Sequence, residues 1–372
     1  MKKGKAAVFV KPYKFEITEL PTLPVDSDGI LVKITSSAIC GSDLHYWRGE
    51  LKPKTSGKPG PIILGHEMTG KIDSLGSNIT TDSMGQKLKE GDRVAFPYFF
   101  PCRRCYNCMR LEFNNCPNRF RFRGTIEELP YCNGGFAEYY YLFPGHFVFK
   151  VPDEVPDETT TSVNCALSQV IYGLQQGGMK IGDSVVIQGA GGLGINAAAA
   201  ATEMGAANVI VIDGIENRLE LARQCGATHT ININEITDEN DRVEHVKKIT
   251  NQRGADIGLE VVGYPGVVNE GISMLRNGGS YVEIGNIWDN SDASIDMSKL
   301  VWNMTKLIGI AHYDPYIIPV ALDFLVRTQS KFPLTNIISH KFALDEISEA
   351  FEQSEWSGKN STTGLTRAIL VP

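Results

Sequence analysis

The chain has 372 residues, and its 43 acidic and 36 basic side chains give a formal net charge of −7 at neutral pH. At about 150 residues per domain, this length predicts roughly two domains. The acidic balance argues against a protein that binds a nucleic-acid backbone. Hydrophobic residues at 42% and charged residues at 21% are typical of a globular protein, which disfavours disorder, and no apolar run of about 18 residues predicts a transmembrane helix.

The first predicted element is a strand near the amino terminus. Residues 6–10 are apolar, and the run stops at Lys11 and Pro12. This run is too short for the core of a signal peptide. We therefore expect a cytoplasmic protein with reduced thiols, in which the eight cysteines serve a purpose other than disulfide bonding.

Possible metal ligands follow, spread over a long stretch of chain. They are Cys40, the adjacent pair His66 and Glu67, and Cys165. Two cysteines and one histidine would leave a fourth position open for substrate on a catalytic zinc. Taken singly, the two cysteines are read more readily as small buried residues and His66 as a core histidine, so only their context favours a metal site.

Four further cysteines lie close together within a segment of fifteen residues, at positions 102, 105, 108 and 116. In a reducing compartment this density indicates a metal site and not disulfides. An iron–sulfur cluster is the alternative, and Pro117 does follow the last cysteine, but the gap of seven residues before Cys116 differs from the three that the ferredoxin pattern shows. We expect a closed four-thiolate zinc that is structural and not catalytic.

The middle of the chain reads as a nucleotide-binding unit. A β-branched run over 184–188 is followed by a glycine-rich turn, an alanine-rich segment and a second apolar run over 208–212. This order of strand, glycine turn, helix and strand, ending in an acidic residue, is typical of dinucleotide binding. In the turn, Gly189 would allow a tight bend, Gly191 would let a pyrophosphate approach, and Gly194 would let helix and strand pack closely; the helix that begins at Gly192 and Leu193 would direct N–H groups at the phosphates.

Asp213 stands where an acidic residue would bind the adenosine ribose. A 2′-phosphate would meet like charge there, which favours NAD over NADP. Arg218 weakens this preference, since an arginine nearby could accommodate that phosphate.

Alternation of helix and strand continues after this unit and differs from what precedes it. We expect a helix over 218–225, a strand over 256–262, a helix over 267–276 and a strand over 280–285, as in a parallel sheet with helices on both faces. Up to about residue 150 the chain instead shows short strands between Pro and Gly turns, such as 91–96, which predicts a mainly β domain. Residues after about 309 follow in an α+β style.

Together these motifs resemble those of the zinc-containing medium-chain alcohol dehydrogenases, over essentially the whole chain. The segment 40–45, the triplet 65–67, the four-cysteine segment, 91–94 and the glycine turn with its acidic residue carry the resemblance. It implies a GroES-like catalytic domain over 1–160, with a structural-zinc lobe at 98–118, an inserted Rossmann domain over 161–308, and a return to the catalytic domain over 309–372. It also implies two zinc ions per chain, NAD, a small-molecule alcohol or carbonyl substrate, and a homodimer or homotetramer.

The resemblance assigns roles to individual residues. Cys40, His66 and Cys165 would hold the catalytic zinc, with Glu67 as a neighbouring group or alternative ligand. Asp43 would orient His66, and Ser42 and His45 would carry the substrate proton away. Arg367 resembles an arginine that binds the pyrophosphate. The zinc would act as a Lewis acid and promote loss of a hydride from the alcohol to the nicotinamide.

The substrate is the least determined part of the prediction. Candidate pocket residues, each of which could equally be an ordinary core or surface residue, are Tyr46, Trp47, Tyr98, Phe136, Asn286 and His312. The expected activity is that of an NAD-dependent zinc alcohol dehydrogenase acting on a primary or secondary alcohol, a diol or a polyol. Three alternatives remain: a polyol or sugar-alcohol dehydrogenase, a zinc-independent reductase of enones or quinones, which would lack the ligand sets, and a non-catalytic descendant that binds zinc and nucleotide.

Overall fold

The computed structural model describes residues 2–53, 60–120, 122–127, 133–357 and 366–372. The chain forms two compact units. Unit 1 comprises Met1–Ser168, Asp314–Val326 and Ile338–Pro372, and unit 2 comprises Gln169–Tyr313 and Arg327–Ile337. The domain limits that we expect from the sequence stay a prediction, because compactness alone does not establish that a segment folds independently.

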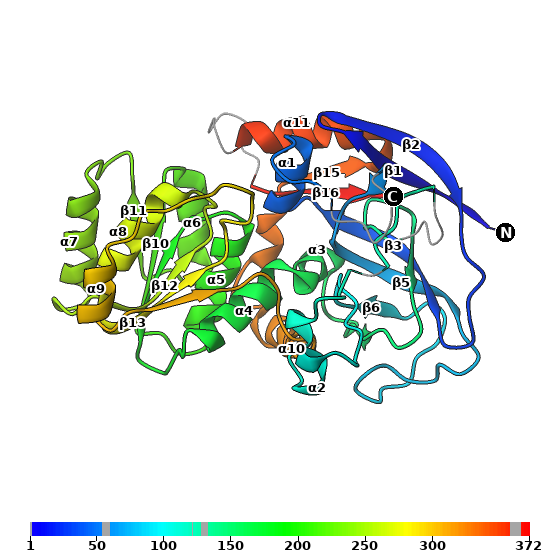
Figure 1. Cartoon of the computed structure of the whole chain (residues 1–372), viewed down its shortest axis with the longest axis horizontal. Helices are drawn as coiled ribbons and strands as arrows, with labels where there is room; N and C mark the ends of the chain where they lie inside the picture. The colour runs from blue at the N-terminus through cyan, green and yellow to red at the C-terminus, as the bar shows by residue number, and fades with distance from the viewer. Residues whose placement is uncertain (1, 54–59, 121, 128–132, 358–365) are drawn as a thin grey trace. The chain divides into compact units, whose positions relative to one another are not determined.

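Unit 1 is mainly β structure (Figure 1). One sheet has the strand order β2-β1-β4, and a larger sheet has the order β15-β16-β3-β5-β6-β8, with β7 also paired to β3. The strands are β1 (Lys3–Lys11), β2 (Lys14–Pro21), β3 (Ile30–Ala38), β4 (Ile62–Ile63), β5 (Glu67–Leu75), β6 (Arg93–Ala95), β7 (Tyr139–Leu142), β8 (Phe149–Lys150), β15 (His340–Ala343) and β16 (Ala368–Val371).

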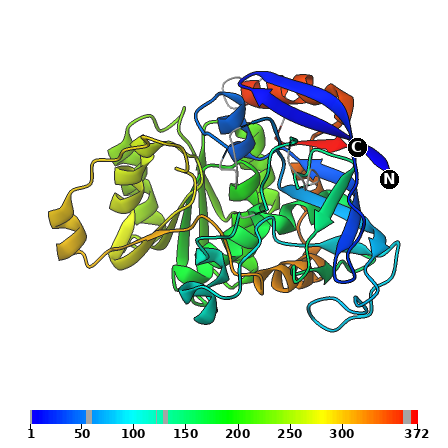
Figure 2. The same cartoon turned by 45° about the vertical axis from the view of Figure 1, so that its right-hand side comes forward.

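Helical segments connect and cover these sheets. Helix α11 lies beside the β1–β2 hairpin in both views (Figures 1 and 2) and packs on α1 and β16. The helices are α1 (Gly41–Trp47), α2 (Tyr106–Met109), α3 (Asp157–Thr160), α4 (Ala166–Gln176), α10 (Ile317–Thr328) and α11 (Ile347–Ser357), and the 3₁₀ turns are η1 (Phe113–Asn115), η2 (Thr161–Asn164) and η5 (Leu344–Glu346). The division between the units falls inside α4 and α10.

Unit 2 is a parallel sheet with the strand order β11-β10-β9-β12-β13-β14, which confirms the predicted Rossmann architecture. Helices α5 and α6 pack together against β9, β10 and β11, whereas α8 packs on β12, β13 and α7 (Figures 1 and 2). The elements are β9 (Ser184–Gln188), α5 (Gly192–Glu203), β10 (Asn208–Asp213), α6 (Glu216–Gln224), β11 (His229–Asn232), α7 (Glu239–Ile249), β12 (Ala255–Glu260), η3 (Pro265–Val267), α8 (Val268–Ser273), β13 (Leu275–Glu283), α9 (Met297–Trp302), β14 (Lys306–Gly309) and η4 (Leu334–Ile337).

The core of unit 2 explains why this segment folds as it does. Strand β9 is buried along its whole length, as expected for a parallel strand covered on both faces. The five alanines over 197–201 are also buried. They favour the helix, and their small side chains let α5 lie close to the sheet.

The predicted boundary between one helix and the strand that follows it is wrong. The helix expected over 267–276 ends at Ser273, and residues from Leu275 onward belong to β13. Leu275 pairs with Ala255 of β12, and a register irregularity follows between Ala255 and Ile257. Pairing with a neighbouring strand therefore overrides the helical pattern of the local sequence.

Among the described residues, no helix combines the length and the apolar character that crossing a membrane requires.

Candidate active site

Neighbouring antiparallel strands bring the predicted ligands of unit 1 together. Ala38 at the end of β3 is the register partner of Glu67 at the start of β5, so Cys40 and His66 lie at the same edge of the sheet. Cys165 follows η2 and directly precedes α4. One ligand atom from each of Cys40, His66, Glu67 and Cys165 lies within 4.8 Å of the other three, and all four residues are buried. This donor set of sulfur, nitrogen and oxygen suits zinc.

Asp43 and Ser42 both contact His66 from the first turn of α1. The Asp43 carboxylate accepts a hydrogen bond from the Cys40 backbone N–H at 3.0 Å, and its other oxygen lies 3.4 Å from His66 Nδ1. This contact holds the histidine ring through Nδ1, as outer partners of metal-bound histidines do. Ser42 Oγ lies 3.4 Å from His66 Nε2, beside the candidate ligand group.

Glu67 and Arg367 form a buried ion pair next to these ligands. Their side chains are 0% and 6% exposed, and Arg367 Nε also donates to the Ile39 carbonyl at 3.3 Å. Burial raises the pKa of Glu67 to about 8, and the charge of Arg367 opposes this shift. Sequence reasoning missed this pairing, because the two residues are 300 positions apart; the predicted contact of Arg367 with a pyrophosphate stays a prediction.

The electrostatic surroundings favour a thiolate at Cys40. A hydrogen bond with the Cys165 thiol lowers the pKa of Cys40 well below its usual range, and the charges of His66 and Arg367 act in the same direction. Because the thiolate is the form that binds metal, these neighbours prepare Cys40 as a ligand.

His45 contacts a carboxylate that the sequence analysis did not single out. Its Nδ1 lies 2.6 Å from Glu50 Oε2, and Arg48 donates from Nε and Nη2 to the two oxygens of the same carboxylate at 2.8 and 2.9 Å. The sequence gives one signal for this arrangement, which is that Arg48 and Glu50 follow His45 by only three and five positions.

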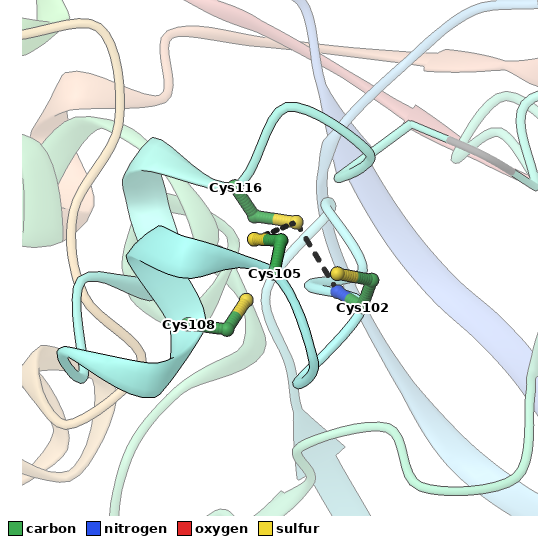
Figure 3. A group of neighbouring side chains, drawn as sticks. All are labelled: Cys102, Cys105, Cys108 and Cys116. Atoms are coloured by element: carbon green, nitrogen blue, oxygen red, sulfur yellow. Dashed lines mark hydrogen bonds between the residues drawn. The ribbon is translucent and has the colours of Figure 1, made fainter.

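The four-cysteine segment folds into a second candidate metal centre in unit 1. Figure 3 shows the four sulfur atoms directed toward one another from the turn before α2, from α2 itself and from the end of η1. Their Sγ atoms all lie within 4.8 Å of one another. The backbone N–H of Arg104 lowers the pKa of Cys102 to about 6, which favours the thiolate. Four sulfur ligands with no open position are typical of structural zinc.

The glycine turn of unit 2 leaves room where a phosphate would bind. Gly189 has φ of +102°, which suits glycine, and a Cβ on Gly194 would lie 1.9 Å from the Gly189 carbonyl oxygen. In contrast, apart from its chain neighbours, no heavy atom of the described residues lies within 4 Å of a Cβ placed on Gly191, which is the N-cap of α5. Gly192 and Leu193 form the first turn of this helix, so its N–H groups border the open space and fit an anion.

Asp213 and Arg218 lie near this turn in the same unit. The Asp213 carboxylate accepts hydrogen bonds from the Ala190 and Ile215 backbone N–H groups at 2.6 and 2.9 Å, which ties the end of β10 to the glycine turn. Arg218 belongs to α6; burial lowers its pKa, and the charge of Asp213 opposes that shift.

Two of the six candidate pocket residues are core residues, which is the alternative that the sequence analysis left open. Trp47 and Phe136 are 1% and 0% exposed and belong to a hydrophobic core, where each ring packs against Phe351. Tyr98 lies beside the ligands, with its ring centroid 4.8 Å from that of His66. Tyr46 packs on the same core, Asn286 binds Glu283, and His312 is half-buried.

Among the described cysteines, Cys225 belongs to neither candidate centre. Cys225 is a buried free thiol of unit 2, and burial raises its pKa to about 12, as expected of an inert core residue. Cys132 lies outside the described residues.

Comparisons with known proteins agree with this geometry. Residues 26–153 match the family described as alcohol dehydrogenase GroES-like domain, and residues 192–327 match the family described as zinc-binding dehydrogenase. The chain is 33% identical to 5-exo-hydroxycamphor dehydrogenase of Pseudomonas putida, with 95% of this chain and 96% of the relative covered. It is 31% identical to sorbitol dehydrogenase of Bacillus subtilis, with 94% and 93% covered.

A solved structure shares the fold over its full length. This is an alcohol dehydrogenase from Thermotoga maritima, which is 31% identical to this chain and superposes with a TM-score of 0.89. Both chains are covered completely.

Proposed function

The chain belongs to the zinc-containing medium-chain dehydrogenases, and we propose that it oxidises an alcohol to an aldehyde or ketone with NAD as the hydride acceptor. The family membership makes it an oxidoreductase that depends on zinc and a nicotinamide cofactor. The observation that carries the proposal is the buried group of Cys40, His66 and Cys165 beside the Ser42 hydroxyl. Three protein ligands leave a zinc position open, as a catalytic centre needs.

The proposed chemistry divides between the bound groups and the protein. Zinc at this position supplies a Lewis acid that makes an alcohol hydroxyl more acidic, and the nicotinamide supplies the hydride acceptor. Asp43 holds the His66 ring in its orientation. Ser42 accepts the hydroxyl proton, and His45 is the group that passes it on toward water. The buried Glu67–Arg367 pair sets the charge next to the ligands, with Glu67 available as an alternative ligand.

We assign the cofactor to the glycine turn of unit 2. The open space at Gly191 accommodates a pyrophosphate, with Gly189, Gly192, Leu193 and Gly194 shaping the turn around it. Asp213 supports NAD in preference to NADP, because a 2′-phosphate would meet its carboxylate. A comparison of reduction rates with NAD and NADP tests this preference, and Arg218→Ala should leave the NADP rate unchanged if that arginine does not bind a 2′-phosphate.

Two variants separate the two proposed zinc ions. We expect two zinc per chain in the purified protein. His66→Ala should lose one zinc and all turnover while the four-cysteine zinc stays bound. Cys105→Ser should lose the other zinc and unfold at a lower temperature, yet retain turnover in the cold. Full activity of His66→Ala or Cys40→Ser would overturn the assignment of the catalytic group.

A substrate screen tests the activity itself. The panel comprises primary and secondary alcohols, diols and polyols, with 5-exo-hydroxycamphor and sorbitol included because two relatives are named for them. Reduction of NAD by at least one alcohol supports the proposal, whereas bound zinc and bound NAD without any turnover would favour a non-catalytic protein.

The surface of unit 2 supports a homodimer. Strand β14 ends the sheet on one side. Five exposed apolar residues belong to this strand or to the segment from α9 that leads into it: Met297, Val301, Trp302, Met304 and Leu307. Exposed clusters of this kind mark interaction sites, and edge strands pair readily with a second chain. Trp302→Glu should convert a dimer into a monomer in analytical ultracentrifugation.

We propose no nucleic-acid or membrane partner, and a cytoplasmic location stays a prediction.

A further inference from the structure

We propose that Glu50, held by Arg48, positions His45 for proton transfer by fixing the hydrogen of the imidazole ring on Nδ1. The inference rests on the proposed function, because the orientation of His45 affects catalysis only if the substrate proton leaves through Ser42 and His45. It adds two residues, Glu50 and Arg48, to which neither the sequence motifs nor the comparisons assign a role.

The backbone after α1 folds Glu50 back over the histidine. The Glu50 N–H donates to the His45 carbonyl at 2.9 Å. Gly49 makes this reversal possible, since it has φ of +78° and a Cβ there would lie 2.9 Å from Pro12 Cγ. The approach of the carboxylate to His45 is therefore determined by the backbone and is not an accident of one flexible side chain.

Arg48 fixes the carboxylate in place. Its Nε and Nη2 bind Oε1 and Oε2 at 2.8 and 2.9 Å, which is the paired geometry that gives arginine–carboxylate contacts their strength and direction. His45 and Arg48 side chains are only 14% and 23% exposed. Partial burial limits competition from water for the same donors and acceptors.

The short contact decides which ring nitrogen carries the hydrogen. Glu50 Oε2 lies 2.6 Å from His45 Nδ1, and a carboxylate oxygen cannot approach an unprotonated nitrogen so closely without a hydrogen between them. Nδ1–H is therefore the donor, and the 3.2 Å approach of Arg48 Nη2 to Nδ1 is a close contact between two donors. In a neutral ring the lone pair then belongs to Nε2.

This arrangement gives His45 the state that a proton acceptor requires. Burial lowers the pKa of His45, and Arg48 acts in the same direction while Glu50 opposes them, so the ring is neutral near neutral pH. A carboxylate that accepts a hydrogen bond from the Nδ1–H of a histidine, so that the lone pair is on Nε2, is the arrangement by which hydrolases orient their general base. Without Glu50, the ring would distribute between two tautomers and several orientations.

Ring-nitrogen NMR tests the inference directly on the zinc-loaded protein. The chain has seven histidines, and a His45→Asn variant assigns the signal when the ring nitrogens are labelled with ¹⁵N. We expect the hydrogen on Nδ1 in the wild type and in Glu50→Gln, because glutamine keeps an acceptor oxygen. In Glu50→Ala the signal should move to that of mixed tautomers.

Turnover with the alcohol that the screen identifies provides the second readout. Glu50→Ala should lower kcat about 10-fold, the size of effect that loss of an outer hydrogen-bond partner produces, with little change in KM, and Glu50→Gln should recover most of it. Glu112→Ala is the matched control. Glu112 also accepts a hydrogen bond from the Nε of an arginine two positions earlier, at 2.9 Å, and its side chain is 39% exposed against 38% for that of Glu50. Unlike Glu50, it has no contact with a histidine among the described residues. Glu112→Ala should leave kcat unchanged.

The possible failures are distinguishable. An unchanged tautomer in Glu50→Ala, or equal losses of kcat in Glu50→Ala and Glu112→Ala, would overturn the role of Glu50 while the enzyme remained a dehydrogenase. A wild-type protein without turnover would overturn the proposed function and the catalytic role of Glu50 with it.

Discussion

The charges buried around the candidate catalytic site occur in pairs, and the pair of Glu67 and Arg367 is the most enclosed. Neither side chain has more than 6% of its surface exposed. A buried ion pair adds little to stability against an apolar pair, but removal of one partner leaves an uncompensated charge in a medium of low polarity. The contribution of each partner to stability therefore depends on the presence of the other.

Replacement of the arginine alone should be strongly destabilising. Above about pH 8, where Glu67 is charged, we expect Arg367→Met to lower the free energy of unfolding by about 3–5 kcal/mol, because the variant leaves that buried charge without its partner. The double variant Glu67→Gln/Arg367→Met should recover most of this loss. Urea unfolding of the zinc-loaded proteins measures both values, and a double variant no more stable than Arg367→Met would show that the pairing is not the cause.

Individual site residues can be predicted from the sequence where they lie close together in the chain. The four cysteines over 102–116 and the segment from Cys40 to His45 are recognisable because their members lie within one turn or lobe. Arg367 could be singled out, but its contact with Glu67 depends on the pairing of β16 with β3, which no local pattern specifies. Glu50 was missed because its role comes from the reversal at Gly49.

Among the elements, the turn between β9 and α5 shows two glycines with different functions. Gly194 permits contact between the helix and the turn, since a Cβ would lie 1.9 Å from the Gly189 carbonyl oxygen, whereas a Cβ on Gly191 would meet, apart from its chain neighbours, no heavy atom of the described residues within 4 Å. Close packing requires the glycine at position 194, and the open space at Gly191 is where we propose that the cofactor binds.

Alanine at each position should separate stability from binding. Gly194→Ala should destabilise the protein by about 1–3 kcal/mol, the range for an overpacked site. Gly191→Ala should change stability by less than about 0.5 kcal/mol but weaken NADH binding, because the new methyl group occupies the phosphate space. Thermal unfolding and NADH fluorescence titration measure the two effects, and normal NADH affinity in Gly191→Ala would contradict the placement of the pyrophosphate.

The ends of β12 and β13 carry two neighbouring acidic groups, of which Glu260 is buried and Glu283 is half-buried. Glu260 and Glu283 are register partners, and the Asn286 amide nitrogen lies 3.3 and 3.1 Å from an oxygen of each. Burial and the neighbouring Glu283 raise the pKa of Glu260 from 4.5 to about 8. The folded state thus binds a proton that the unfolded state releases between these two values.

This shift predicts how stability depends on pH. Because the folded pKa lies above the unfolded one, the stabilisation from the bound proton is complete below about pH 4.5 and is lost as pH rises toward about 8, by up to about 1.4 kcal/mol per pH unit. Glu283→Gln removes the neighbouring charge, so its urea midpoint should fall less between about pH 6 and about pH 8 than that of the wild type. An equal fall of the urea midpoint in the two proteins would show that Glu283 does not raise the pKa of Glu260. Glu244→Gln, a substitution of an exposed residue, is the control.

Element types were predictable where the hydrophobic pattern is strong, as in β9, α5 and β10. Their ends were less so. The helix expected to reach residue 276 gives way at Leu275 to a strand, because the edge of β12 offers backbone hydrogen bonds that local sequence does not reveal.

For the molecule as a whole, the fold assembles sites from segments that are far apart in the chain. Unit 1 is built from three stretches of sequence and unit 2 from two. Cys165 reaches the ligands from a turn that lies 125 positions after Cys40, so neither spacing nor composition alone could have grouped them. The resemblance to a known family supplied that grouping, and family membership is what makes the oxidoreductase assignment firm.

The proposed reaction transfers hydrogen directly from the alcohol carbon to the nicotinamide. It is tested most directly by incubating the zinc-loaded protein and NAD with an alcohol that carries deuterium on the carbon bearing the hydroxyl group. We expect one deuterium on the nicotinamide ring for each carbonyl product in the wild type, and none in a His66→Ala variant that still binds NADH. Deuterium released to water, or transfer undiminished in His66→Ala, would contradict the proposed reaction.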